Sequence, residues 1–285
     1  MNFLILGCNG MAGHTITLYL KENGYNVVGF AHSKSPFVKT IIGDAHDTEH
    51  IKTEILNGNY DIIVNAIGIL NKACDENHSD AIFINSYLPH YLASVTDNMN
   101  TRIIQLSTDC VFSGSVGKYT ENSFPDGVTF YDRTKALGEL MDKKNITLRN
   151  SIVGPDINKN GIGLLNWFML QKVEVNGYKN VIWTGMTTLQ LARTIEKLSM
   201  CDAYGLYNMV PEVSINKYDL LCLFNKYIRK HQIKILPVEI PKVNKSLERT
   251  NYKGFKDKIP DYDDQVKDLA QWMKQHKSIY KYYDI

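Results

Sequence analysis

A tyrosine and a lysine four residues apart, Tyr131 and Lys135, form the pair in this sequence best suited to proton-transfer chemistry. On a helix, residues i and i+4 lie on one face, so the phenol and the ammonium would project side by side. A free tyrosine, with a pKa of about 10, exchanges protons poorly at pH 7. A neighbouring ammonium, together with the positive ring of a nicotinamide, favours the phenolate and lowers that pKa, which makes the tyrosine a usable general acid for a carbonyl that is being reduced.

A hydroxyl at the end of a predicted strand could complete this site. Residues 101–106 are predicted as a strand, and Ser107-Thr-Asp-Cys-Val-Phe-Ser-Gly114 follows it, at the edge where open α/β sheets bind ligands. Thr108 would hydrogen-bond to the carbonyl oxygen that Tyr131 protonates, and Lys135 would also hold the ribose of a nicotinamide. A Tyr-x-x-x-Lys pair alone is frequent on protein surfaces, so this catalytic trio depends on the other motifs.

Glycines recur at positions 7, 10 and 13, directly after a short apolar run at 3–6 that is predicted as a strand buried on both faces. A helix is predicted over 11–23. Such a turn lets bare backbone approach a pyrophosphate, whose charge sits at the helix N-terminus, although three glycines at this spacing also arise by chance. Gly24 should end the helix in the left-handed conformation. The residues of this predicted cofactor turn are Gly7, Asn9, Gly10, Met11 and Gly13.

The residues after the second predicted strand, 26–30, indicate which nicotinamide cofactor binds. Ala31-His-Ser-Lys-Ser35 contains no acidic residue that could bind the adenosine ribose 2′-hydroxyl. Ser33 and Lys34 could instead hold a 2′-phosphate, which favours NADPH and leaves NADH possible, although a surface lysine is most often only solvated. Asp44 and Asp47 follow; Asp47 could equally cap a helix that begins near residue 48.

Two further segments are expected to reach the cofactor or to support it. The predicted strand 60–68 ends in small residues, so the backbone of Ala66, Ile67 and Gly68 could pass close to the nicotinamide-side ribose. Asn85 lies inside a helix predicted over 79–96. An asparagine there is either a buried polar anchor or an exposed residue.

Strands and helices alternate as far as residue 153, which predicts an α/β fold: a doubly wound parallel (Rossmann) sheet with a smaller C-terminal α/β substrate lobe. The predicted cofactor domain is 1–154, with 184–214 packing back on it, and the predicted substrate lobe is 155–183 with 215–285. Further strands are predicted at 146–153, 179–183 and 233–240, the last being an edge strand because it contains Pro237. Helices are predicted at 164–172, 187–200, 217–231 and 262–276.

Composition narrows the class of protein. The chain has 285 residues, is 44% hydrophobic and 22% charged, and carries a net charge of +2, which does not argue for nucleic acid. No apolar stretch approaches the roughly 18 residues of a membrane span, and Met1 leads directly into a predicted strand, so we expect a cytoplasmic protein without a membrane partner. Five scattered cysteines without a C-x-x-C pair suggest neither disulfides nor a metal site. The sequence is silent on oligomeric state, a homodimer being one possibility.

Taken together, the motifs resemble the dTDP-4-dehydrorhamnose reductase branch of the extended short-chain dehydrogenases, over nearly the whole length. The resemblance implies that Thr108, Tyr131 and Lys135 are catalytic, that Asp44 and Asp47 flank the adenine, and that a nucleotide sugar is the substrate. The motifs that carry it are Gly7-Cys-Asn-Gly-Met-Ala-Gly13, Ser107-Thr-Asp-Cys-Val-Phe-Ser-Gly114, Tyr131-Asp-Arg-Thr-Lys135 with Gly138-Glu139, and Leu148-Arg-Asn-Ser-Ile-Val-Gly154.

Two residues depart from the pattern of that branch. Cys110 stands where dTDP-rhamnose enzymes usually have Tyr, which argues against rhamnose synthesis proper. Asp132 stands where Gly usually follows the catalytic tyrosine. Residues 108–114, Phe124-Pro-Asp-Gly127 and Asn180-Val-Ile-Trp-Thr-Gly-Met-Thr-Thr188 are more similar to enzymes of capsule and O-antigen synthesis that reduce UDP-linked 4-keto-6-deoxy-N-acetylhexosamines.

The implied activity is reduction of the 4-keto group of a nucleotide-linked 4-keto-6-deoxyhexose, UDP-linked and N-acetylated, for surface polysaccharide. Three alternatives stay open. They are a dTDP-4-dehydrorhamnose reductase proper, a non-catalytic NADP-binding subunit like the regulatory partner of methionine adenosyltransferase, and a 4,6-dehydratase or epimerase. The intact trio argues against the second, and the lack of an Asp-Glu pair after Thr108 argues against the third.

Residues that could hold the sugar nucleotide lie mostly in the predicted lobe. Lys245 and Arg249 could neutralise the diphosphate, although each alone is more often a solvated surface charge. Trp183 is more typical of a core than of a sugar platform. The full candidate set is Asp109, Asn166, Trp167, Lys172, Trp183, Lys245 and Arg249.

Overall fold

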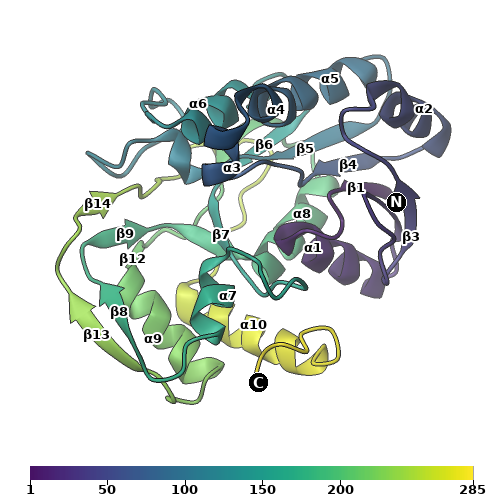
Figure 1. Ribbon diagram of the computed structural model, residues 1–285. Helices are drawn as coiled ribbons and strands as arrows, with labels where there is room; N and C mark the ends of the chain where they lie inside the picture. The colour runs from purple at the N-terminus through teal and green to yellow at the C-terminus, as the bar shows by residue number, and fades with distance from the viewer. Residues whose placement is uncertain (285) are drawn as a thin grey trace.

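Seven strands form the central sheet of the protein (Figure 1). The computed structural model describes residues 1–284; Ile285, the last residue of the predicted lobe, lies outside them. In chain order the strands are β1 (Asn2–Leu6), β2 (Asn26–Ala31), β3 (Lys39–Ile42), β4 (Ile62–Asn65), β5 (Arg102–Leu106), β6 (Ile146–Arg149) and β11 (Gly205–Asn208). Their spatial order is β11-β6-β5-β4-β1-β2-β3, and every neighbouring pair is parallel. The predicted doubly wound α/β fold is confirmed.

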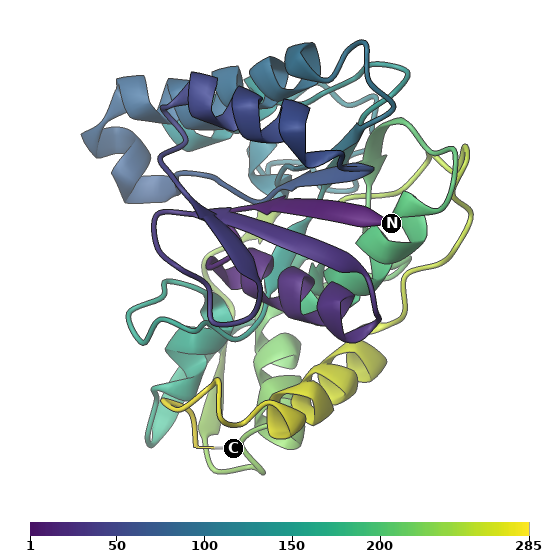
Figure 2. The same ribbon diagram turned by 90° about the vertical axis from the view of Figure 1, so that its right-hand side faces the viewer.

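Helices cover both faces of this sheet, because the side chains of a buried strand point alternately to opposite sides. Phe3 and Ile5 of β1 belong to one apolar core, and Leu4 and Leu6 belong to another, so the predicted two-sided burial of β1 is confirmed (Figure 2). The helices on the first face are α1 (Met11–Glu22) and α8 (Thr188–Ser199). Those on the second face are α2 (Thr48–Gly58), α3 (Asn71–Glu76), α4 (His78–Ile82), α5 (Leu88–Val95) and α6 (Phe130–Leu137).

The rest of the chain builds a smaller unit with its own apolar core beside the sheet. Its helices are α7 (Leu164–Met169), α9 (Lys217–Tyr227) and α10 (Tyr262–Gln275), and its strands are β8 (Glu174–Tyr178), β9 (Val181–Trp183), β12 (Ile215–Asn216), β13 (Lys234–Val238) and β14 (Val243–Asn244). β8 pairs with β13, and β9 lies between β12 and β14. The pair β7 (Ser151–Val153) and β10 (Gly185–Thr187) leads from the sheet into this unit.

Several predicted elements are confirmed, and others differ for physical reasons. The apolar stripe of α10 is buried as its spacing predicts, and Pro237 lies in β13, an edge strand of a two-stranded sheet. The predicted strand 146–153 divides, since β6 pairs within the main sheet whereas β7 pairs with β10. The sequence analysis missed several short elements, which carry no continuous apolar run and are partly exposed in the case of β3 and β8. They are β3, β8, β10, β11, β12, β14 and α3.

Residues 184–214 lie on the main sheet. β11 pairs with β6, and α8 packs against α1. Residues 184–214 thus pack on the main sheet, as the sequence analysis expected. The boundaries of the cofactor domain and of the substrate lobe stay a prediction. Within residues 1–284, no helix is long and apolar enough to cross a membrane.

A buried ion pair fixes the end of α6 against the sheet. Arg149 of β6 donates to both carboxylate oxygens of Glu139, at 2.9 and 2.6 Å, and the two side chains are 2% and 3% exposed. Ser107, directly after β5, donates a third hydrogen bond to Glu139 at 2.6 Å. Three segments therefore meet at one carboxylate, and two of them, α6 and the segment after β5, carry predicted site residues.

We expect Arg149→Met to lower the free energy of unfolding by about 3–5 kcal/mol, because it leaves a buried carboxylate without its charged partner. Urea denaturation followed by circular dichroism would measure this change. The matched control is the double variant R149M/E139Q, which removes both charges and should recover part of the loss. An R149M protein as stable as the wild type would contradict the assignment.

Candidate active site

Three adjoining cavities follow the carboxyl edge of the sheet. The outer cavity, of about 430 Å³, lies over β1 and β2; the central cavity, of about 560 Å³, lies over β4 and β5; the lobe cavity, of about 560 Å³, opens into the smaller unit. The outer and central cavities share Gly10 and the backbone segment 66–68. The central and lobe cavities share Asp109, Cys110 and Ser151. One continuous cleft therefore passes from the glycine turn into the lobe.

The glycine turn has the geometry that a pyrophosphate site needs. Gly7 has a φ of +79°, and a Cβ added to Gly13 would lie 2.0 Å from the carbonyl oxygen of Gly7, so both positions exclude a side chain. α1 begins after Gly10 without a side-chain cap, and Gly10 and Met11 line the central cavity. The free N–H groups of the first turn are thus available to an anion, so these residues fit a dinucleotide. The predicted helix end is confirmed by Gly24, with a φ of +83°.

The segment after β2 is held against the glycine turn. The side-chain amide of Asn9 donates to the backbone oxygen of Ser33 at 2.9 Å and to its hydroxyl at 3.3 Å. Ser33 and Asp44 line the outer cavity, whereas Lys34 is exposed beside it. Asp47 accepts a hydrogen bond from the N–H of His50 at 3.0 Å, which confirms that it caps α2.

The residues at the start of α6 explain where this helix begins and so where it places Tyr131 and Lys135. Thr129 and Asp132 form a capping box, in which each side chain accepts the other's backbone N–H at 3.1 Å. Asp132, the departure from the family pattern, therefore starts the helix. Tyr131 and Lys135 lie on the buried side of α6, and both line the central cavity with Thr108, so the structure brings the predicted trio together.

The pKa of Tyr131 is set mainly by burial. Burial raises this pKa above its usual value, while the Thr108 hydroxyl acts in the opposite direction. Lys135 directs its ammonium at the backbone oxygen of Leu106, 2.7 Å away. Burial lowers the pKa of Lys135 to about 8, and attraction to Glu139 opposes that shift. Among the protein's own groups the net shift of the Tyr131 pKa is upward, because burial outweighs the groups that lower it; the lowering expected from the lysine together with the nicotinamide ring stays a prediction.

The sequence left two alternatives open for Asn85, a buried polar anchor or an exposed residue. The structure shows that Asn85 is buried and acts as an anchor. It lies in a π-helical turn, Phe83–Tyr87, that interrupts the predicted helix 79–96. Its amide accepts from the N–H of Ile69 at 3.0 Å and donates to the oxygen of Ile69 at 2.9 Å and to the Thr134 hydroxyl at 3.2 Å. Asn85 thereby ties the loop that follows β4 to α6. That loop contains Ala66, Ile67 and Gly68, which line the outer and central cavities as predicted.

The lobe cavity contains four of the predicted substrate residues: Asp109, Trp167, Trp183 and Lys245. Lys172 is exposed and does not line it. Asp109 is 5% exposed, and burial raises the pKa of its carboxyl. Trp183 is buried, as a core residue would be, and also forms part of the cavity wall. The remaining wall is mostly apolar.

Two predicted substrate residues have structural roles instead. The guanidinium of Arg249 donates to the backbone oxygens of Asn251, Phe255 and Asp257, which commits it to a loop away from the cavity. Asn166 holds the loop at 158–163 through the oxygens of Lys159 and Gly161, and it accepts the Tyr283 hydroxyl. The predictions that these residues bind substrate were wrong, because buried polar side chains need partners and found them in the backbone.

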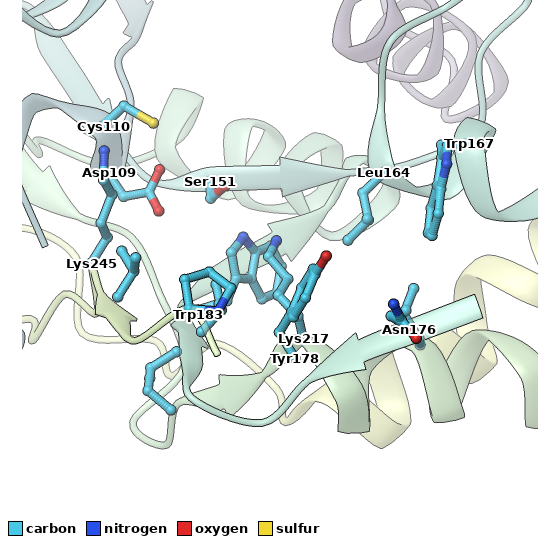
Figure 3. A pocket seen from close by; sticks show the side chains of 15 residues that line it. Asp109, Cys110, Ser151, Leu164, Trp167, Asn176, Tyr178, Trp183, Lys217 and Lys245 are labelled. Carbon is cyan, nitrogen blue, oxygen red and sulfur yellow. The ribbon is translucent and has the colours of Figure 1, made fainter. Parts of the chain in front are cut away.

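Sequence reasoning missed several polar residues of the lobe cavity, among them Asn176, Tyr178 and Lys217 (Figure 3). The first two lie in β8, a strand that was not predicted. Lys217 is the first residue of α9, where a cation opposes the positive end of the helix dipole. A lysine at this unfavourable position of the predicted helix 217–231 could have been recognised from the sequence as a candidate site residue.

The fold and the site define an oxidoreductase of the extended short-chain dehydrogenase/reductase class. Its Rossmann sheet carries the glycine turn and the predicted Thr-Tyr-Lys trio around one cavity at the carboxyl edge of the strands. The family model described as RmlD substrate binding domain matches residues 1–282, and the chain belongs to this family. Within residues 1–284, no cluster of three or more His, Cys, Asp or Glu side chains is placed to hold a metal.

Three known proteins illustrate the range of this family. A probable low-salt glycan biosynthesis reductase of Haloferax volcanii is 32% identical over 49% of this chain, although the match spans only 48% of that protein's length. The methionine adenosyltransferase 2 subunit beta of Xenopus laevis is 23% identical over 77% of this chain and 70% of its own. The crystal structure of dTDP-4-dehydrorhamnose reductase from Bacillus anthracis, in complex with NADP, superimposes with a TM-score of 0.77 at 19% identity, covering 94% of this chain and 98% of that one.

The depressed pKa of Lys135, about 8 against about 10.5 for a free lysine, makes stability depend on pH. Between these values the unfolded chain keeps a proton that the folded chain releases, so stability rises with pH across this window. We expect the wild type to gain up to about 3 kcal/mol relative to Lys135→Met as the pH rises from 8 to 10.5. Urea denaturation of both proteins at several pH values tests this, and a constant difference between them would contradict it.

Proposed function

We propose that this protein is an NADPH-dependent reductase of the 4-keto group of a nucleotide-linked 4-keto-6-deoxyhexose. The observation that carries the proposal is the position of Thr108, Tyr131 and Lys135. They line a central cavity between a dinucleotide-type glycine turn and a substrate-sized lobe cavity. A keto sugar that enters from the lobe would meet these side chains and the cofactor at one point.

Each part of the cleft has a distinct role in holding the cofactor. The first turn of α1 holds the pyrophosphate, and Ser33 with Lys34 receives the adenosine 2′-phosphate. Asp44 lies at the adenosine end. The backbone of 66–68, supported by Asn85, passes along the nicotinamide-side ribose.

Bound NADPH supplies the hydride that reaches the keto carbon. Tyr131 donates its phenolic proton to the carbonyl oxygen as the C–H bond forms, which gives the alcohol. Thr108 donates a hydrogen bond to the same oxygen and polarises the carbonyl. The Lys135 ammonium holds the ribose hydroxyls, and its oxygen partner on Leu106 fixes its position.

We propose a UDP-linked 2-acetamido-2,6-dideoxy-4-hexulose as the substrate, for the synthesis of a surface polysaccharide. Cys110 supports this choice, because it lies in the wall common to the central and lobe cavities, where a smaller side chain than tyrosine leaves room for a substituent on the sugar. Burial raises the pKa of its thiol to about 11, so Cys110 is a neutral part of that wall.

A second candidate is a non-catalytic NADP-binding subunit. It is favoured by the likeness to the methionine adenosyltransferase 2 subunit beta over 77% of the chain. The buried trio supports catalysis instead, since a purely regulatory protein has no need of a buried lysine and tyrosine facing one cavity.

NADPH oxidation with a UDP-linked 4-keto-6-deoxy-N-acetylglucosamine, run beside the dTDP-linked 4-keto-6-deoxyhexose, tests the proposal. Faster oxidation with the UDP sugar supports the N-acetylated substrate, and the reverse result identifies rhamnose-type chemistry. Tight NADPH binding without oxidation of either sugar would favour the regulatory subunit.

We expect Tyr131→Phe to lower kcat by about 10²- to 10⁴-fold while NADPH affinity stays the same, because the variant loses only the proton donor. Steady-state kinetics and cofactor fluorescence titration measure the two quantities. Tyr282→Phe, at an exposed tyrosine, is the matched control and should behave as the wild type. Unchanged turnover in Y131F would remove this residue from the mechanism.

We expect Ser33→Asp to raise the KM for NADPH at least about tenfold, because a carboxylate in the outer cavity would repel the 2′-phosphate. NADH lacks that phosphate and serves as the internal control, so its KM should change little. Equal effects on both cofactors would show that Ser33 does not contact the 2′ position.

A further inference from the structure

The lobe cavity contains a cation with no acceptor. Within the described part of the chain, the Lys217 ammonium forms no ion pair within 4.0 Å and no hydrogen bond; it lies 5.0 Å from the centre of the Trp183 ring. The ammonium is desolvated, and its pKa falls to about 8 although Asp109 attracts it. A cation in such a place weakens the folded protein, so its presence points to a ligand.

A second donor without a partner lies in the wall of the same cavity. Trp183 is 3% exposed and lines the cavity wall, and its indole Nε1 is buried without a hydrogen-bond partner. Buried indole N–H groups usually find an acceptor. Lys217 and Trp183 therefore form one donor pair, which an oxygen-rich anion would satisfy.

The order of side chains along the cavity tells which part of a ligand meets this pair. Figure 3 shows Asp109, Cys110 and Lys245 at one end, which adjoins the central cavity, and Leu164, Trp167 and Asn176 at the other. Lys217, Trp183 and Tyr178 lie between the two ends. In a nucleotide sugar the diphosphate likewise separates the reacting hexose from the base.

We propose that Lys217 is the cation that binds the diphosphate of the nucleotide-sugar substrate, with Trp183 as a second donor. This assignment rests on the proposed function. Lys217 takes the role that the sequence analysis gave to Arg249, whose guanidinium is committed to backbone oxygens. Lys245 adds a second positive charge at the hexose end, and the rim at Trp167 and Tyr178 offers aromatic surface to the base.

Binding of UDP, dTDP and uridine, measured by isothermal titration calorimetry, separates the diphosphate from the base. Lys217→Met should weaken the binding of UDP and dTDP about 10- to 100-fold and leave uridine binding unchanged, because only the charge-assisted contacts are lost. Lys217→Arg should retain most of the affinity. Lys172→Met, at an exposed lysine outside the cavity, is the matched control and should bind as the wild type.

Folding and cofactor binding serve as internal checks. K217M should melt no lower than the wild type, because it removes a desolvated charge from the start of α9, and its NADPH affinity should be unchanged. Equal UDP affinity in K217M and the wild type, or an equal loss for uridine, would overturn the assignment. A wild type that binds neither nucleoside diphosphate would also overturn it.

Failure of the proposed function gives a different result. Suppose that UDP binding depends on Lys217 but the wild type oxidises NADPH with neither keto sugar. That result would support the diphosphate site and reject the proposed reductase activity. If the wild type instead reduces a keto sugar, but K217M binds UDP as tightly as the wild type does, the reductase activity is supported and the diphosphate site at Lys217 is rejected.

Discussion

The carboxylate of Glu139 is the point on which the site depends. It joins the end of α6, strand β6 and the segment after β5 through Arg149 and Ser107, and it attracts the Lys135 ammonium one helical turn away. A buried carboxylate is tolerated only when it is fully paired, so the partners hold one another in place. The positions of Thr108 and Lys135 relative to the sheet follow from this arrangement.

The charged side chains that line the cleft lower the stability of the folded protein, because they are buried away from water. Burial shifts the pKa values of Lys135, Lys217 and Asp109 toward their neutral forms. Binding sites commonly keep such desolvated groups because a ligand gives them partners that the folded chain lacks. An oxygen-rich, anionic ligand would therefore give Lys135 and Lys217 partners, while the rest of the lobe wall is mostly apolar.

The C-terminal segment connects the lobe to the cofactor turn. The Tyr280 hydroxyl lies 3.1 Å from Nε2 of His14, whose Nδ1 lies 2.9 Å from the backbone oxygen of Gly10. Tyr283 bonds Asn166 at 2.7 Å and receives the N–H of Asp156 at 2.8 Å, next to the loop that borders the central cavity. Asn166 thus helps to fix the loop that borders the central cavity.

The sequence by itself indicated the parallel sheet apart from β3 and β11, the glycine turn, and the side-by-side placement of Tyr131 and Lys135. These features depend on local rules: an apolar run buries a strand, glycine spacing shapes a turn, and i, i+4 spacing puts Tyr131 and Lys135 on one helix face. Only the tertiary structure decided which polar residues of the lobe face the cavity. Arg249 and Lys217 carry the same charge in the sequence, but the backbone oxygens around Arg249 satisfy its guanidinium, whereas Lys217 meets a tryptophan ring and an open cavity. The partners of a buried charge come from segments that lie far apart in the chain, so a local sequence pattern does not predict them.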